Sequence, residues 1–210
     1  MIKILIADDH AIVRKGLKQI LDDEPDMVVV DECSNGSELL AKIGALDCNL
    51  ILLDISMPGR NGLEILEQLH NEKPALPVLI LSMYPEEQYA FRALRAGAAG
   101  YLTKVSAPDE LITAIRKVYW GGKYVSATLS EKLASELGRK TGKPSHDELS
   151  NREYQVMCQL ATGKSVSEIS DGLSLSVKTV STYRKRILTK MQMKNNAEII
   201  NYVIKHGLLD

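Results

Sequence analysis

The chain has 210 residues, of which 45% are hydrophobic and 25% are charged. This composition is typical of a globular protein and excludes intrinsic disorder, and the length allows one large domain or two smaller ones. No apolar run reaches the length of a membrane span, and the apolar stretch at the N-terminus is too short for a signal peptide. We therefore expect a cytoplasmic protein without a membrane partner.

The net charge of −1 conceals two halves of opposite character. Residues 1–120 contain 12 Lys and Arg against 18 Asp and Glu, a net charge of −6. Residues 121–210 contain 14 against 9, a net charge of +5. An acidic half and a basic half suggest two domains with different partners.

The cysteines are few, and none forms a CxxC pair: Cys33, Cys48 and Cys158. Their odd number and wide spacing argue against a disulfide framework and against a zinc site. We interpret them as buried, reduced thiols.

Apolar strand-like runs alternate with amphipathic helical patterns through the first 120 residues. The expected strands cover residues 2–7, 27–32, 50–54, 77–82 and 100–104. Helical spacing of apolar residues lies between or after them, at 12–21, 63–69 and 111–119. Because parallel strands need crossover connections, these repeats predict an α/β doubly wound domain with a five-stranded parallel sheet covered on both faces.

The pattern changes after residue 120, where paired glycines interrupt it. We assign residues 121–147 to a linker that is partly helical. A helix over 127–138 would place three apolar side chains on one face, those of Leu129, Leu133 and Leu137.

Residues 148–210 are predicted to form an all-α domain. Four short helices are expected, at about 150–162, 166–173, 177–191 and 196–205. Ser150 and Glu153 have the spacing of a capping box at the start of the first of these helices.

Polar side chains are predicted at the carboxyl ends of four strands. Asp8 and Asp9 follow the first strand, Asp54 ends the third, Ser82 ends the fourth and Lys104 ends the fifth. The carboxyl ends of the strands in a doubly wound sheet border one crevice, so we expect these side chains to gather there. Three carboxylates so close repel one another, and Mg²⁺, a hard cation that prefers oxygen ligands, relieves that repulsion.

This set of residues suits the formation of an aspartyl phosphate. Mg²⁺ and Lys104 would neutralise a phosphoryl group while the carboxylate of Asp54 attacks phosphorus, and Ser82 would hydrogen-bond a phosphoryl oxygen. Asp54 is the expected nucleophile because Asp8 and Asp9 lie together as metal holders. A single Asp at the end of a strand is more often a helix cap or a turn residue, so the prediction depends on the whole set.

Residues 1–120 resemble the receiver domain of two-component response regulators, through DDH (8–10), LDISMPGRNG (53–62), LS (81–82) and AAGYLTK (98–104). The resemblance implies Asp54 as the phosphoacceptor and Asp9 as a direct Mg²⁺ ligand, with Asp8 nearby and acting through water. It also implies that the backbone carbonyl of Ser56 is the third protein ligand of Mg²⁺ and that Lys104 pairs with the phosphoryl group. Ser82 is the implied switch hydroxyl, and Tyr101 is the implied switch aromatic.

Two residues depart from common receiver sequences. Val105 follows Lys104, where many receivers have a proline after a cis peptide bond, and this weakens the case for a cis bond here. Met83 follows Ser82, where a small residue is common, and this larger residue is expected to slow the access of a phosphodonor, although its side chain is flexible.

The segment 174–196 contains no acidic residue and six cations, Lys178, Arg184, Lys185, Arg186, Lys190 and Lys194. Taken alone, such a segment is as often a solvated helix face as a nucleic-acid site. Here a short helix, a tight turn and a longer basic helix form a helix-turn-helix pattern. Small polar residues near the start of the second helix would approach base edges, and the longer cations would contact phosphates.

Residues 147–210 resemble the LuxR-type helix-turn-helix domain of the NarL/FixJ family, through LSNRE (149–153) and GKSVSEISDGLSLSVKTVSTYRKRILTKMQMKN (163–195). The resemblance implies base-reading positions at Ser181, Thr182 and Lys185. It implies phosphate contacts from Lys178, Thr179, Arg184 and Lys190. Tyr183 stands where the family usually has His, and the last helix is the implied dimer surface.

Together these features predict a DNA-binding response regulator. A sensor histidine kinase would phosphorylate Asp54, and the chain would then form a homodimer on double-stranded DNA and regulate transcription, with RNA polymerase as a further candidate partner. We do not expect a turnover enzyme, although the chain would hydrolyse its own aspartyl phosphate. Two alternatives are a Mg²⁺-dependent phosphatase that uses the same acids and a DNA-binding protein independent of phosphorylation. The histidines show no ligand spacing, and we interpret all four as structural or surface residues: His10, His70, His146 and His206.

Overall fold

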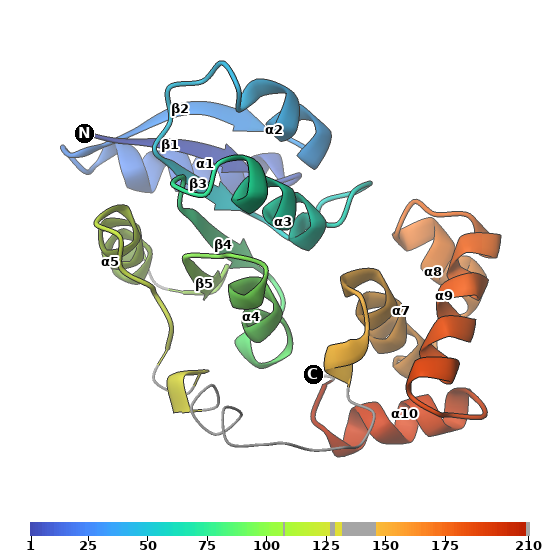
Figure 1. Ribbon diagram of the computed structural model, residues 1–210. Coiled ribbons are helices and arrows are strands. Elements are labelled where there is room, and N and C mark those ends of the chain that lie inside the picture. Colours follow the sequence, from blue (N-terminus) through green and yellow to red (C-terminus); the bar gives the residue numbers. More distant parts are fainter. Residues whose placement is uncertain (107, 127–128, 132–145, 209–210) are drawn as a thin grey trace. The chain divides into compact units, whose positions relative to one another are not determined.

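The computed structural model describes residues 1–106, 108–126, 129–131 and 146–208. The chain divides into two compact units, Met1–Leu137 and Gly138–Asp210 (Figure 1). The first contains a sheet with its helices, and the described part of the second is helical. The finer limits predicted for the linker, at residues 120 and 147, stay predictions. Among the described residues, no helix is both long and apolar enough to cross a membrane.

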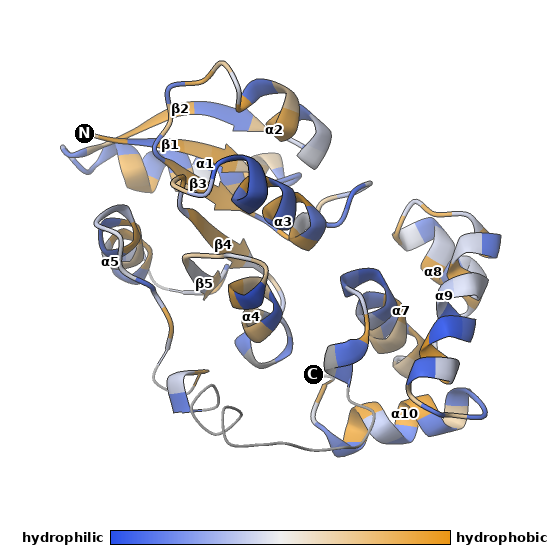
Figure 2. Ribbon diagram, in the orientation of Figure 1, coloured by the Kyte–Doolittle hydropathy of each residue, from blue (hydrophilic) through white to orange (hydrophobic). Residues whose placement is uncertain are grey.

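Parallel strands form the sheet of the first unit in the order β2-β1-β3-β4-β5. They are β1 (Ile2–Ala7), β2 (Met27–Cys33), β3 (Leu50–Leu53), β4 (Val78–Ser82) and β5 (Gly100–Thr103). β3 and β4 are buried along their whole length, because apolar residues face both sides of the sheet (Figure 2). The predicted five-stranded doubly wound fold is confirmed. β3 and β5 each end one residue earlier than predicted, just before the charged residue that follows.

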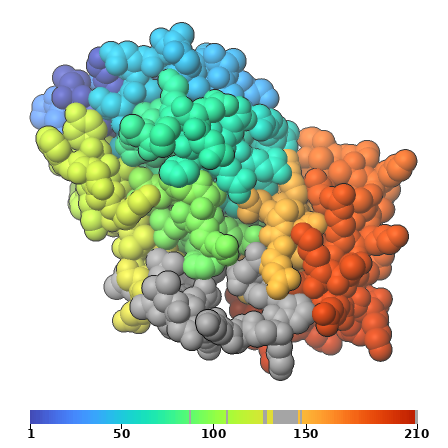
Figure 3. Space-filling model, viewed as in Figure 1, coloured from blue at the N-terminus to red at the C-terminus, as the bar shows by residue number. Residues whose placement is uncertain are grey.

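Helices cover both faces of this sheet. They are α1 (Ala11–Asp22), α2 (Gly36–Lys42), α3 (Gly62–Glu72), α4 (Glu86–Arg95) and α5 (Pro108–Tyr119). Leu21 of α1 and Ile115 of α5 belong to one apolar core with side chains of β1, β3 and β4. On the opposite face α2 contacts α3 and α3 contacts α4, and their side chains hide most of the sheet in Figure 3.

The chain turns back after α5 and pairs with the edge of the sheet. Gly121 has a positive φ of 83°, and Tyr124 then forms an isolated parallel bridge with Gly100 of β5. The amide of Tyr124 donates to the carbonyl of Ala99 at 2.9 Å, and the amide of Tyr101 donates to the carbonyl of Tyr124 at 3.3 Å. This short pairing satisfies backbone groups at the exposed side of β5.

The helix predicted over 127–138 lies mostly outside the described residues. Residues 129–131 are helical, and Leu129 is buried. The hydroxyl of Ser126 accepts a hydrogen bond from the amide of Leu129 at 3.0 Å, as a helix cap does.

The second unit contains the predicted helices, each within one residue of its expected limits. They are α7 (Asn151–Ala161), α8 (Val166–Gly172), α9 (Val177–Lys190) and α10 (Asn196–Lys205), preceded by the 3-10 turn η1 (His146–Glu148). The capping box of Ser150 and Glu153 is confirmed, and Ser165 and Glu168 form a second one. Because α7 contacts α9 and α10 while α8 contacts α9, the all-α fold has a single core.

The three cysteines are free thiols. Cys33 and Cys158 are buried, as predicted, and Cys48 is half-buried. Burial raises the pKa of Cys33 to about 11, so this thiol stays protonated and unreactive at neutral pH.

Candidate functional site

The register of the strands places the predicted polar residues together at the carboxyl ends of the strands. The last paired residues of β1 and β3 are Ala7 and Leu53, so Asp8 and Asp54 emerge next to each other. β4 and β5 are also paired up to their last residues, Ser82 and Thr103. Ser82 and Lys104, the last two members of the set, therefore lie at the same carboxyl end of the sheet.

Lys104 joins two of the acids in a buried ion-pair cluster. Its Nζ lies 2.6 Å from Oδ2 of Asp8 and 2.5 Å from Oδ2 of Asp54. The three side chains are only 4%, 3% and 0% exposed. A buried carboxylate is tolerated only when it is paired, and one ammonium here compensates two carboxylates incompletely. The site therefore retains an excess of negative charge.

The ionisation of this cluster reflects burial and pairing together. Burial raises the pKa of Asp54, and the opposing effects of Lys104 and of the Ser56 amide do not cancel it. Burial acts to lower the pKa of Lys104, but its hydrogen bonds with Asp54 and Asp8 outweigh that effect and raise it. The lysine is thus held in its charged form.

Backbone contacts fix the position of the Asp54 carboxylate. The Asp54 amide donates to the carbonyl of Ala7 at 2.8 Å, which continues the β1–β3 pairing. The Ser56 amide donates to Oδ1 of Asp54 at 2.8 Å, while Oδ2 faces Lys104. Both carboxylate oxygens are therefore oriented before any ligand arrives.

The loop after Asp54 is tightly packed against the start of α3. A Cβ atom on Gly62 would lie 2.4 Å from Cα of Ile55 and 2.9 Å from the carbonyl oxygen of Asp54, so only glycine fits there. Asn61 caps α3 by accepting a hydrogen bond from the Leu63 amide at 2.8 Å. Gly62, which lies in the segment that resembles receiver domains, therefore allows the chain to pack closely beside Asp54.

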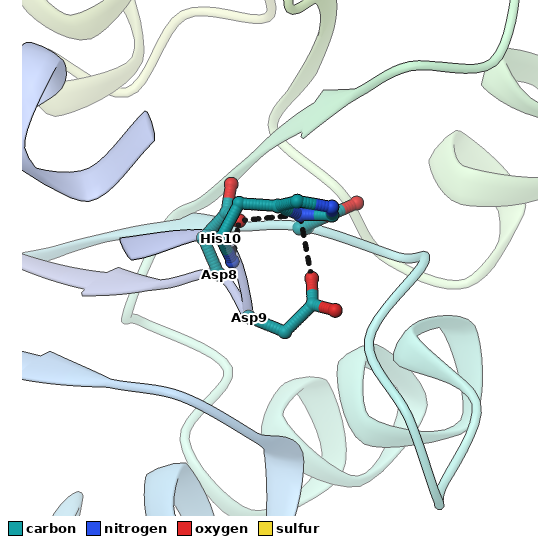
Figure 4. A group of neighbouring side chains, drawn as sticks. Asp8, Asp9 and His10 are labelled. Atoms are coloured by element: carbon teal, nitrogen blue, oxygen red, sulfur yellow. Dashed lines mark hydrogen bonds and ion pairs between the residues drawn. The ribbon is translucent and has the colours of Figure 1, made fainter. Parts of the chain in front are cut away.

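Asp8, Asp9 and His10 form a second cluster that adjoins the first. His10 Nδ1 lies 2.9 Å from Oδ1 of Asp9 and 3.3 Å from Oδ1 of Asp8, as the dashed lines in Figure 4 show. One ligand atom from each of these residues and from Asp54 lies within 4.8 Å of the others. Sequence analysis predicted the acids at this place but interpreted His10 as structural or surface.

This donor set fits a divalent cation. Three carboxylates supply hard oxygen ligands, and a single lysine offsets only part of their charge. Oδ1 of Asp9 is buried and accepts no hydrogen bond from the described part of the chain. A divalent cation bound at this position would give this buried oxygen a partner.

Ser82 and Tyr101 lie deep beside the acidic cluster. Ser82 is fully buried, and its Oγ accepts a hydrogen bond from the Tyr84 amide at 3.2 Å. Tyr101 is only 1% exposed, and its hydroxyl donates to the carbonyl of Tyr84 at 2.8 Å. Burial raises the pKa of Tyr101, so its hydroxyl remains a donor. Both predicted switch residues therefore contact the backbone of Tyr84, which sequence analysis did not single out. The exposed Met83 lies between Ser82 and Tyr84 in the sequence.

In the second unit, α9 has a buried face and an exposed basic face. Val180 and Ile187 are buried in the helical core. Four of the predicted DNA-binding residues are exposed, namely Lys178, Ser181, Thr182 and Lys185, and Thr179 is half-buried. The hydroxyl of Thr182 already donates to the carbonyl of Lys178 at 2.9 Å. Figure 2 colours much of the ribbon of α9 blue or near white, which marks residues of hydrophilic or intermediate hydropathy.

The remaining two candidates have partners inside the helical unit. Arg184 Nε donates to Oδ1 of Asn196 at 2.7 Å, which ties α9 to α10. Lys190 Nζ lies 2.7 Å from Oε2 of Glu153, which ties α9 to α7. These contacts span distant parts of the sequence and were not predicted. The phosphate contacts assigned to both cations stay predictions.

Comparison with known proteins gives the same division of the chain. Residues 4–116 match the family of response regulator receiver domains, and residues 147–203 match the luxR family of bacterial regulatory proteins. Response regulator UvrY of Escherichia coli O157:H7 is 36% identical over 209 residues, which cover 99% of this chain and 96% of that protein. Oxygen regulatory protein NreC of Staphylococcus carnosus is 37% identical over 215 residues, with 99% of each chain covered.

A solved structure supports the fold of both units. RcsB from Salmonella enterica serovar Typhimurium, bound to promoter rprA in the presence of the phosphomimetic BeF3−, has a TM-score of 0.68 and 27% identity. The alignment covers 97% of this chain and 98% of that one.

A doubly wound domain with a buried acidic cluster and a buried lysine, followed by a helix-turn-helix unit, defines the class of DNA-binding response regulators. Within this class, the chain belongs to the NarL/FixJ family, with a receiver domain and a LuxR-type DNA-binding domain.

Proposed function

We propose that this chain is a transcription regulator switched by phosphorylation of Asp54. The observation that carries the proposal is the position of Lys104, whose Nζ contacts both Asp8 and Asp54 in a buried cluster at the carboxyl ends of the strands. A phosphoryl group brings three oxygens that need compensating charge, and Lys104 already supplies a fixed cation at this cluster.

In the proposed reaction a sensor histidine kinase supplies the phosphoryl group from a phosphohistidine. A carboxylate oxygen of Asp54 attacks phosphorus, the P–N bond breaks, and its electron pair returns to the leaving imidazole. The Ser56 amide keeps the Asp54 side chain in one orientation. Lys104 moves its contact from Asp54 to a phosphoryl oxygen while Asp8 continues to hold its Nζ.

Mg²⁺ is the proposed cation of this site. Bound there, it supplies positive charge beside the phosphoryl oxygens. The residues proposed to hold it are Asp9 and Asp54 directly, Asp8 through water, and the backbone carbonyl of Ser56. Support comes from the surplus of carboxylates over cations and from the buried Oδ1 of Asp9, which has no hydrogen-bond donor among the described residues.

The proposed response begins at Ser82 and Tyr101. A phosphoryl oxygen on Asp54 offers the Ser82 hydroxyl a stronger acceptor, because a charged acceptor makes the stronger hydrogen bond. The Tyr84 amide then loses its bond to Ser82 Oγ, and the Tyr101 hydroxyl, which donates to Tyr84, is disturbed with it. The two conformations differ in free energy, so phosphorylation shifts their populations.

The proposed output is sequence-specific binding of double-stranded DNA by a homodimer. Ser181, Thr182 and Lys185 lie on the exposed face of α9 and are proposed to read bases. Lys178, Thr179, Arg184 and Lys190 are proposed to contact phosphates, and α10 to form the dimer surface. Because its DNA target and its kinase domain partner lie in the cytoplasm, the chain is proposed to act there, with RNA polymerase as a further partner.

Phosphate labelling tests this function. With acetyl phosphate and Mg²⁺, we expect up to one phosphate per chain in the wild type, none in Asp54→Asn and normal labelling in Asp22→Asn, a control on the exposed surface of α1. Equal labelling of Asp54→Asn and wild type would refute the proposal. Release of many phosphates per chain from excess acetyl phosphate would instead support the phosphatase alternative, because we propose a stoichiometric acceptor and not a turnover enzyme.

A further inference from the structure

Arg14 of α1 turns its guanidinium back toward the junction between β1 and α1. Its Nη1 donates to the backbone carbonyl of Asp8 at 2.7 Å, and its side chain is only 18% exposed. A hydrogen bond from a charged donor is stronger than one between neutral groups. Because the peptide bond is planar, holding this carbonyl also sets the direction of the amide of Asp9. Arg14 therefore fixes the backbone from which both acidic side chains leave.

Glu32 of β2 holds the other side of the guanidinium. Arg14 Nε donates to Oε2 of Glu32 at 3.0 Å, while Nη1 faces Asp8. A guanidinium is planar and rigid, so two hydrogen bonds from different nitrogens determine its orientation. The arginine thus connects the edge strand β2 to the β1–α1 junction, through the backbone of Asp8.

A change of register in β2 places Glu32 on the face of the sheet that α1 covers. Val29 packs against the apolar core that contains side chains of α1. Strand side chains alternate between the two faces, so regular pairing would put Glu32 on the opposite face. The pairing with β1 instead skips one residue after Val29, as in a β-bulge, and this reverses the faces. Glu32 then reaches Arg14, and Asp31 pairs with Lys42 of α2 on the other face.

The repulsion between the two acids explains why such a tie is needed. Asp8 and Asp9 each place a carboxylate oxygen in a group that spans at most 4.8 Å, and neighbouring carboxylates repel each other. Rotation of the peptide between them would let the side chains separate. We propose that Arg14 is a positioning residue for the Mg²⁺ ligands of the proposed phosphoacceptor site and that Glu32 orients it. The inference rests on that proposed function and adds two residues that act through the backbone of Asp8.

Charge and position have opposite effects on the affinity for Mg²⁺. Arg14→Met retains the apolar stem and the helix propensity but removes the guanidinium. If Arg14 acted only through its charge, its removal would leave the acids in a more negative environment, and Mg²⁺ would bind more tightly. If Arg14 positions the acids, their separation weakens binding. The direction of the change in the Mg²⁺ Kd therefore distinguishes the two roles.

Isothermal titration of the full-length chain with Mg²⁺ measures this direction. We expect Arg14→Met to raise the Kd about tenfold or more, because groups that orient metal ligands contribute strongly to metal affinity. Lys18→Met is the matched control, since it removes an exposed cation from the same helix, and it should leave the Kd within about twofold. An unchanged or lowered Kd in Arg14→Met would overturn the inference.

A double-mutant cycle tests the part assigned to Glu32. Glu32→Gln weakens the acceptor of Arg14 Nε at a partly exposed position, where the substitution leaves the fold intact. It should raise the Mg²⁺ Kd about threefold in the wild type and leave it unchanged in Arg14→Met, where no guanidinium remains to be oriented. A charge effect of Glu32 or a general structural defect would raise the Kd equally in both backgrounds, and that result would overturn the inference.

Labelling of Asp54 separates this outcome from that of the proposed function. Arg14→Met should be labelled more slowly than the wild type at low Mg²⁺ and at nearly the wild-type rate at saturating Mg²⁺. A wild type that binds no Mg²⁺ or accepts no phosphate would contradict the proposed function. A wild type that does both, beside an Arg14→Met variant with an unchanged Mg²⁺ Kd, would contradict only the role of Arg14.

Discussion

Glu153 shows how single residues hold the DNA-binding unit together. Its carboxylate is 3% exposed and is paired with Lys190, and it accepts the Ser150 amide at 2.8 Å. Burial acts to raise the pKa of Glu153, but Lys190 and Ser150 outweigh it, so the pKa is lowered from 4.5. The charged form is therefore stabilised by folding.

This pKa predicts how the stability of the helical unit depends on pH. A folded pKa below the unfolded value contributes stability that is present above about pH 4.5 and is lost as the pH falls through the folded pKa. Glu153→Gln should lower the free energy of unfolding by about 1 kcal/mol at pH 7, a modest loss because Lys190 remains partly in solvent. It should also reduce the dependence of the melting temperature on pH between about pH 3 and 6. Thermal melts across this range, followed by circular dichroism, check it. An unchanged slope in Glu153→Gln would contradict the assignment.

Two lysines of α9 should behave differently when substituted. Lys185 is exposed and has a proposed base-reading role, so Lys185→Ala should weaken specific DNA binding by about 1–3 kcal/mol, relax the sequence preference and leave the melting temperature unchanged. Lys190→Met leaves Glu153 buried without its cation, so it should lower the melting temperature. Fluorescence anisotropy with labelled DNA, together with thermal melts, distinguishes the two. Equal loss of stability in both variants would be inconsistent with these roles.

Residue-level contacts also mark the limit of sequence reasoning. Asp8, Asp9, Asp54 and Lys104 could be predicted because each follows a strand that an apolar run makes visible. The partners of Lys190 and Arg184 could not, because they lie 37 and 12 residues away and are set by how the helices pack. The sequence contains one indication of where His10 lies, because His10 directly follows two acids, but sequence analysis did not use it.

At the scale of elements, the β1–β3 register and the loop before α3 decide where Asp54 lies. Pairing of Ala7 with Leu53 aligns the two acids, and Gly62 allows α3 to start against the backbone of Ile55. The positions of the strands and their parallel pairing could be predicted from apolar runs and connections, whereas this close approach depends on tertiary packing. The pairing of Tyr124 with Gly100 was not predicted either, because a single bridge involves no apolar run in the sequence.

Gly62 should be the least replaceable glycine of the described site. Gly62→Ala places Cβ 2.4 Å from a backbone atom, and we expect a loss of about 1–3 kcal/mol or more, together with slower labelling of Asp54. Gly16→Ala is the matched control: this helical glycine has no atom within 4 Å of its Cβ position, so alanine should stabilise α1 by about 0.5–1 kcal/mol. Chemical denaturation of both variants measures the difference. A neutral Gly62→Ala would show that the loop is not constrained as described.

At the scale of the whole molecule, opposite charges separate input from output. Residues 1–120 carry a net charge of −6 and contain the buried acidic cluster, while residues 121–210 carry +5 and expose a basic helix. This division was visible in composition alone, and both folds agree with it. Composition does not reveal the contacts of Ser82, Tyr84 and Tyr101 within the first unit, which appear only in three dimensions.

The central claim is that phosphorylation of Asp54 controls DNA binding by α9. A genome-wide map of bound DNA, in cells that express either the wild type or Asp54→Asn at equal abundance, measures this directly, whatever the sequence of the operator. We predict discrete sites with one shared sequence motif in the wild type and the loss of most of them in Asp54→Asn. The same sites with the same occupancy in both strains would contradict the account and would identify a DNA-binding protein independent of phosphorylation.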